Sequence, residues 1–219
     1  RISFSFDADL LDSLERRQPR TYAAILEADH RSRAAHGGHG AALAAPYPPL
    51  LLPLVGPAEK RTAVLWGKAD LERRLGGAPE GMWLPANAAD DESLEAVASA
   101  GLRFTVLAPR QAQAVRPSGA PPETPWLAVG PETLGTPRPY LWRSRRPGGP
   151  SLAIFFHRQD ISPGRIYDSL PFAVLGSRSP AAAREQVVEV GQRLANRLID
   201  AFTVNDAVVL DWSHVVADT

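Results

Sequence analysis

The sequence contains no cysteine, which excludes disulfide bonds and thiolate metal sites within this chain. A composition of this kind is typical of a reducing compartment, and we predict a cytoplasmic protein. No stretch approaches the roughly 20 apolar residues that cross a bilayer as a helix. The first residues, RISFSFDADLL, lack the basic segment and apolar run of a signal peptide, so we predict no membrane association.

An excess of charge of either sign is also absent, because 24 Lys and Arg residues balance 24 Asp and Glu residues. Proteins that bind nucleic acid usually carry a basic excess, so we predict no nucleic-acid partner. Hydrophobic residues make up 44% of the chain, which indicates a globular protein. The sequence has no initiator Met and begins and ends in strand-like patterns, so we expect a fragment of a longer protein. Its oligomeric state is not indicated.

Helical and strand-like segments alternate between residues 58 and 110. A helix over 58–75, in which Gly67 permits close packing, precedes an apolar strand at Gly81–Leu84. A second helix over Asp91–Ala100 precedes a strand at Arg103–Leu107. This alternation predicts an α/β fold with parallel strands.

Further elements extend this prediction over a single domain, residues 1–219. We expect four strands to be parallel neighbours in one barrel-like sheet, incomplete in this chain: Ile2–Phe6, Gly81–Leu84, Arg103–Leu107 and Ala207–Leu210. Further helices are expected at Pro19–Ala35 and Pro180–Phe202. Pro139–Arg143 and Leu152–His157 are predicted to form an inserted β-hairpin, and proline-rich loops are expected at 45–57 and 115–139.

Carboxylates that follow strands are the first candidates for chemistry, since barrel enzymes keep their sites at the carboxyl ends of strands. Asp7 and Asp9 follow the first strand, an arrangement also found in metal-dependent polysaccharide deacetylases, although the two histidines that such a site needs one helical turn apart are missing. The alternative is that Asp9 caps the next helix. Asp90 opens an acidic run that is typical of a helix N-terminus, and Asp211 ends the last predicted strand.

Histidine and tryptophan supply the remaining candidates. His36 and His39 are the closest histidine pair, but the surrounding glycines exclude the helical i, i+4 spacing of a zinc site, so we predict no metal. We also predict no cofactor. Trp83 ends the Gly81–Leu84 strand, where an aromatic ring either stacks on a sugar or packs in the core.

Several stretches of the sequence resemble glycoside hydrolase family 57, especially the branch whose members carry an additional C-terminal region of unknown function. They are RISFSFDADLLDSLERRQPRTYAAILEADHRS, GGHGAALAAPYPPLLLPL, LWGKADLERRLGGAPEGMWLPANAADDESLEAVASAGLRFTVLAPRQA and RPGGPSLAIFFHRQDIS. The resemblance covers the chain from Arg1 to about Phe202. It implies a (β/α)7 barrel of the α-amylase, branching-enzyme and 4-α-glucanotransferase type, which cleaves or transfers α-glucan with retention.

The resemblance also implies which catalytic groups to expect. Retaining enzymes use two carboxylates about 5–5.5 Å apart; in this family they are a Glu nucleophile and an Asp acid/base. The Glu directly follows Trp-Leu-Pro, and that position is Ala86 here. Asp211 is the tentative acid/base, although the Gly-Glu that follows this Asp in the family is missing.

Other polar positions of the family are changed as well. The chain keeps the Gly-His-Gly motif around His39 and keeps Tyr47. The family's Asn, Gln, Asn and His are replaced by Ala41, Ala44, Pro48 and Pro49. We therefore expect a pseudoenzyme with an α-glucan or oligosaccharide as a possible partner, and His39, Trp83 and Asp7 as substrate-binding candidates.

Three other interpretations stay open. In the first, the chain is an active carbohydrate hydrolase that uses other carboxylates, such as Asp90 or Asp211. In the second, it is a deacetylase-like barrel that depends on a metal. The last alternative is a non-catalytic glucan-binding or scaffold protein.

Overall fold

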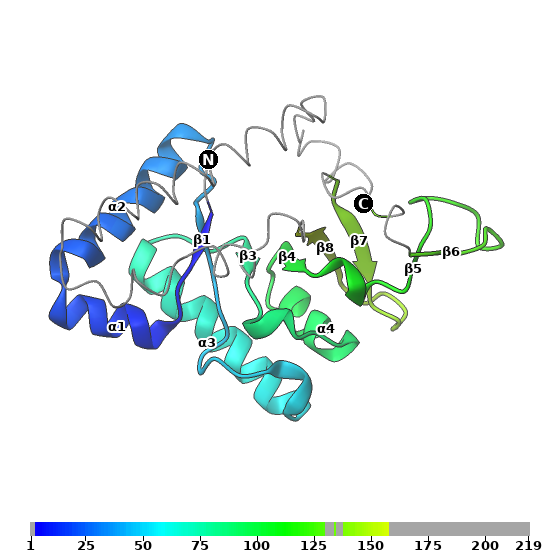
Figure 1. Ribbon diagram of the computed structural model, residues 1–219, viewed down its shortest axis with the longest axis horizontal. Coiled ribbons are helices and arrows are strands. Elements are labelled where there is room, and N and C mark those ends of the chain that lie inside the picture. The colour runs from blue at the N-terminus through cyan, green and yellow to red at the C-terminus, as the bar shows by residue number, and fades with distance from the viewer. Residues whose placement is uncertain (1–2, 130–133, 135–137, 158–219) are drawn as a thin grey trace, which may run out of the picture. The chain divides into compact units, whose positions relative to one another are not determined.

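The computed structural model describes residues 3–129, 134 and 138–157 (Figure 1). One compact unit comprises Arg1–Leu134 and Pro139–Phe156, and a second comprises Gly135–Arg138 and His157–Thr219. Only Arg138 and His157 of the second unit are described, so the account below concerns the first unit. The expected helix at 180–202, the expected strand at 207–210 and the candidate Asp211 lie outside the described residues. The single domain stays a prediction.

Five parallel strands follow one another across the first unit. β1 (Phe4–Ser5) pairs with β2 (Ala42–Leu43), and β3 (Gly81–Met82) pairs with β4 (Phe104–Leu107), which pairs with β8 (Ser151–Phe156). A parallel bridge between Ala44 and Met82 joins β2 to β3. The described chain therefore has α/β character, and β1, β3, β4 and β8 are labelled in Figure 1.

β2 corrects the expected strand order, because it separates β1 from β3. β1 and β2 form a two-stranded sheet of their own, and the Ala44 bridge connects them to the four-stranded sheet. The sequence did not predict β2, since its alanine-rich segment lies between glycines and prolines, all of which are depleted in strands. Closure into a seven-stranded barrel is not shown by the described residues.

Four α-helices connect the strands at the expected places: α1 (Ala8–Arg17), α2 (Pro19–Ala35), α3 (Pro57–Leu75) and α4 (Asp91–Ser99). Pro19 occupies the start of α2, where its fixed φ suits the helix and its missing N–H is not needed. Gly76 ends α3 with a left-handed φ of 67°. The cap of α1 differs from the expectation: Asp7, rather than Asp9, accepts a hydrogen bond from the Leu10 amide at 2.8 Å.

The predicted hairpin is confirmed, but β8 is not an insertion. β7 (Tyr140–Arg143) pairs with β8 in antiparallel orientation. β8 also pairs in parallel with β4 from Phe104 to Leu107, so it belongs to the main sheet. Its sequence, SLAIFF, is a nearly continuous apolar run, as expected for a strand buried on both faces.

The two proline-rich loops contain short elements. A 3₁₀ turn, η1 (Leu52–Leu54), lies within 45–57. β5 (Ala114–Val115) and β6 (Leu127–Ala128) form a small antiparallel ladder, so part of 115–139 is regular structure. We call residues 112–129 the arm. It contains β5 and β6, and it precedes the hairpin in the sequence.

The core lies between the sheet and the helices that follow its strands. Met82, Leu84 and Val97 are fully buried there. Thr105 is also buried, and its hydroxyl donates a 2.7 Å hydrogen bond to the carbonyl of Met82. This contact fastens β4 to β3, the strand that carries the Trp-Leu-Pro sequence.

Candidate functional site

The loop after β3 presents Ala86 to solvent at the carboxyl end of the sheet. Leu84 is fully buried and anchors the loop, while Pro85–Asn87 form a single 3₁₀ turn, η2. Ala86 has a φ of 53°, and Asn87 has a φ of 54°. A left-handed backbone costs an L-residue about 1–2 kcal/mol. Two such residues in succession indicate a loop whose shape is imposed by its surroundings.

Neighbouring strand ends hold this loop in place. The Trp83 amide donates to the Ala44 carbonyl at 2.7 Å, which ties the loop to the end of β2. Gln111 follows β4, and its side-chain amide donates to the Asn87 carbonyl at 2.7 Å. The carboxyl ends of β2, β3 and β4 therefore meet at Ala86, as expected for a barrel site. Asn87 also has a buried side-chain oxygen, Oδ1, with no hydrogen-bond partner among the described residues.

The strain at Ala86 leads to a stability prediction. We expect Ala86→Gly to raise the free energy of unfolding by about 1 kcal/mol, because glycine adopts a positive φ without the Cβ clash. Ala88 is a matched control: it lies two residues away, with an ordinary φ of −71°. Ala88→Gly should be neutral or destabilising. Chemical denaturation of both variants checks this, and equal loss of stability in the two would contradict the strained loop.

Asp90 is occupied by structural contacts. It caps α4 by accepting the Ser93 amide at 2.8 Å, and its other oxygen accepts from the buried ammonium of Lys60 at 2.7 Å. Lys60 also donates to Glu92 at 3.0 Å. Partial burial alone would raise the pKa of Asp90, but the hydrogen bonds from Lys60 and Ser93 hold it below its usual range. The interpretation of this acidic run as a helix N-terminus is confirmed.

Asp7 lies at the carboxyl end of β1, the same edge as Ala86. Its carboxylate is engaged in the α1 cap, and β2 lies between its strand and β3. Trp83 is half-buried at the end of β3. Among the described residues, no group of three His, Asp or Glu side chains is placed to hold a metal ion.

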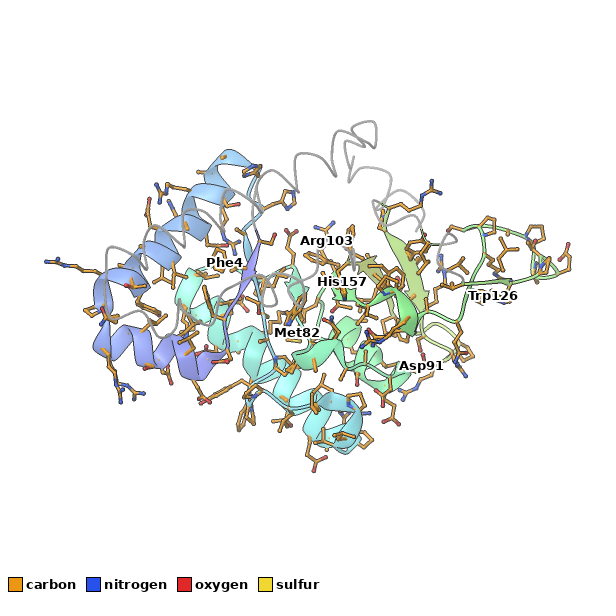
Figure 2. The ribbon with its side chains drawn as sticks, viewed as in Figure 1. Phe4, Met82, Asp91, Arg103, Trp126 and His157 are labelled. Atoms are coloured by element: carbon orange, nitrogen blue, oxygen red, sulfur yellow. The ribbon has the colours of Figure 1, made fainter. Side chains whose placement is uncertain are left out.

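His39, which the family resemblance groups with Asp7 and Trp83 as a substrate-binding candidate, lies at the opposite edge from Ala86 and Asp7. It precedes β2, and its Nδ1 lies 2.8 Å from Oε2 of Glu80, which precedes β3. Arg103, which precedes β4, donates to Oε1 of Glu80 at 2.7 Å. The three side chains form a charged cluster at the amino ends of parallel strands, where Arg103 is labelled in Figure 2. His39 lies at this edge because it precedes β2, whereas Asp7 and Ala86 follow β1 and β3.

One buried carboxylate that supports this part of the fold was not recognised from the sequence. Asp29 on α2 is 1% exposed, and its Oδ1 accepts from the amides of Ala41 and Ala42 at 2.6 and 2.8 Å. Its Oδ2 accepts from Arg33 at 2.7 Å. The signal was its position in the apolar stripe of α2, since Asp29 follows Tyr22, Ile25 and Leu26 at core-facing spacing.

A second cluster joins three helices. The buried Arg74 of α3 donates to Asp70, on the same helix, at 2.7 Å and to Glu15 of α1 at 3.3 Å. It also donates to Asp12 of α1 and to the Tyr22 hydroxyl of α2. These contacts engage all three nitrogens of the guanidinium and hold α3 against α1 and α2, so we assign them to stability.

A comparison with solved structures finds a likeness in fold. The chain is similar to the crystal structure of 4-alpha-glucanotransferase from Thermococcus litoralis, with a TM-score of 0.56 and 17% sequence identity. The match covers 80% of this chain and 24% of that protein, so the chain spans about a quarter of its length. No family model matches the sequence, and no curated protein does. The described part of the chain thus has the fold of a segment of a glucan-acting enzyme.

None of the helices in the described part of the chain combines the length and the apolar character that a membrane span requires.

Proposed function

We propose that the chain belongs to a carbohydrate-active protein of the glycoside hydrolase family 57 type that binds α-glucan without cleaving it. The observation that carries this proposal is Ala86: a methyl group is presented to solvent at the carboxyl end of β3, directly after Trp-Leu-Pro. Two further facts support it. The fold is similar to part of a 4-alpha-glucanotransferase, and the strand ends on both sides of β3 hold the loop in a strained conformation.

The chemistry of the loop explains the lack of cleavage in this proposal. Retaining hydrolysis requires one carboxylate to attack the sugar and a second to protonate the leaving group. The side chain of Ala86 offers neither an acid nor a nucleophile. The carboxylate nearest in sequence, Asp90, is committed to Lys60 and to the start of α4.

The alternatives receive less support. An active hydrolase that uses Asp90 would have to break the Lys60 contact and the helix cap. One that uses Asp211 depends on a residue outside the described ranges. A deacetylase-like site at Asp7 would compete with the α1 cap. A scaffold that does not bind glucan would differ from our proposal in one measurable respect: amylopectin in a gel would not slow its migration.

A reversion experiment tests the proposal. We expect the parent chain to leave maltooligosaccharides intact, and we expect Ala86→Glu to stay inactive as well. Groups that act as a unit are not restored singly, and Ala41, Ala44 and Pro49 replace polar residues of the family pattern. The measurement is the release of reducing ends from amylose, with Ala88→Glu as the matched control.

Turnover by the parent chain would contradict the proposal, because it would show that a carboxylate elsewhere in the chain is catalytic. Strong cleavage by Ala86→Glu, with none by Ala88→Glu, would contradict the expectation that the rest of the site has decayed. It would show that a single substitution separates the chain from an active enzyme.

A further inference from the structure

A groove of about 770 Å³ lies between the arm, the start of α4 and the hairpin strand β7. The apolar side chains of Leu94, Leu107 and Phe156 line it together with Tyr140 and Trp142. This volume falls within the range of roughly 300–1,000 Å³ that is usual for small-molecule sites. Ala86 does not line the groove, so the groove is separate from the nucleophile position.

Aromatic side chains are the groove's most distinctive feature. Trp126 on the arm is 61% exposed, a large fraction for so apolar a side chain. The Arg116 guanidinium lies over its ring, 4.7 Å from the centroid. On the facing wall, the Trp142 indole N–H donates to Asp91 at 3.1 Å. Figure 2 labels Trp126 on the arm and Asp91 at the start of α4.

Both carboxylates that line the groove are paired with cations. Asp91 accepts from Arg145 at 2.9 Å, and Asp90 accepts from Lys60. Arg116 is engaged with Trp126 and with the carbonyl of Pro122. Because both carboxylates are paired, the groove does not favour a cationic ligand. Exposed aromatic faces beside polar groups suit the apolar faces and hydroxyl edges of sugar rings.

The groove also borders the Ala86 loop. Gln111 lines the groove, and its side-chain amide holds the Asn87 carbonyl of that loop at 2.7 Å. A ligand in the groove would therefore lie next to the face where the family pattern places the cleaved bond.

We propose that this groove is a binding site for neutral α-glucan chains, with Trp126 as its stacking surface. The inference rests on the proposed function and names the surface that performs the binding. The ring of Trp126 packs against a glucose ring, Arg116 fixes the orientation of the indole, and Trp142 with Asp91 provides the opposite wall. The glucan is held without participation of the Ala86 loop.

The test is the affinity of the full 219-residue chain for maltoheptaose, measured by calorimetry, together with its retardation in gels that contain amylopectin. We expect Trp126→Ala to weaken binding by about tenfold, the effect of losing one aromatic contact. Trp126→Phe should retain most of the affinity, because it keeps an aromatic face. Trp66→Ala is the matched control: Trp66 is 57% exposed on α3 and does not line the groove.

The possible outcomes separate this inference from the proposed function. If the parent chain does not bind maltoheptaose or amylopectin, both fail. If the parent chain binds and Trp126→Ala binds equally well, the glucan lies elsewhere and only the groove assignment is overturned. The same holds if Trp66→Ala weakens binding as much as Trp126→Ala does. If Trp126→Ala melts earlier than the parent chain, the Trp126→Phe variant decides. Loss of binding by Trp126→Phe, with a melting curve like that of the parent chain, would overturn the stacking role.

Discussion

Replacing Asp29 with alanine should destabilise the protein more than Gly67→Ala or any substitution at an exposed position. We expect the free energy of unfolding to fall by about 3–5 kcal/mol, with a drop in Tm of roughly 10 °C or more. Asp29 is 1% exposed and accepts three hydrogen bonds, two from the amides of Ala41 and Ala42 and one from Arg33. Alanine would leave two buried amides and the Nε–H of Arg33 without their acceptor.

Two further variants make the Asp29 measurement specific. Asp29→Asn keeps an oxygen that can accept from the two amides but removes the charge that pairs with Arg33, so its loss of stability should be intermediate. Glu27→Ala alters an exposed carboxylate on the same helix, whose pair with Arg31 is 3.6 Å long. That change should cost no more than about 0.5 kcal/mol. Equal melting curves for Asp29→Ala and Glu27→Ala would contradict the anchoring role.

Gly67→Ala should also destabilise the protein, although α3 is a regular helix at this position. Helix propensity alone predicts a gain of roughly 1 kcal/mol. The structure predicts the reverse, because a Cβ on Gly67 would lie 1.8 Å from the carbonyl oxygen of Ala45. The obstacle is backbone rather than a flexible side chain, so the 45–50 segment would have to shift. We expect a loss of about 1–3 kcal/mol, as for other overpacked positions.

An opposite substitution on the same helix provides the control. Ala69 is exposed, two residues along α3. Ala69→Gly should cost about 1 kcal/mol through helix propensity alone. The account therefore predicts that both changes lower the Tm in thermal denaturation. A higher Tm for Gly67→Ala would show that the loop does not lie on the helix as closely as described.

The helices were the most predictable part of the fold. Their ends carry local signals that act within a few residues, such as Pro19 at the start of α2 and Gly76 after α3. The hairpin was predictable for a similar reason, since two apolar runs flank a turn rich in glycine and proline. The Gly67 contact was also indicated, because a glycine within a helix requires a packing reason.

Features that depend on distant partners were not predictable. β2 is only two residues long and exists because β1 pairs with it and Met82 bridges to Ala44. The direction of His39 depends on Glu80, which lies 41 residues further along the chain. The role of Asp29 depends on amides that its own helix does not contain. The hydrophobic pattern of one sequence segment does not indicate contacts with distant segments.

The candidate site was predictable as a loop but not as a surface. The sequence placed Ala86 after a buried strand, and the structure shows that loop at the meeting ends of β2, β3 and β4. The groove beside it was not predicted, since the proline-rich arm had no periodicity that would place Trp126 near α4. The arm was interpreted as a loop, and its short β5–β6 ladder came from the structure.

The most direct test of the central claim is proton NMR on the 219-residue chain mixed with maltoheptaose, because one sample reports both binding and cleavage. We predict saturation transfer from the protein to the sugar protons, together with integrals of the α-1,4 anomeric signals that stay constant over a day. Loss of those anomeric signals, which reports hydrolysis, or conversion of maltoheptaose into shorter and longer chains, which reports transfer, would contradict the claim that the site at Ala86 is inactive. A lack of saturation transfer would contradict the claim that the chain binds glucan.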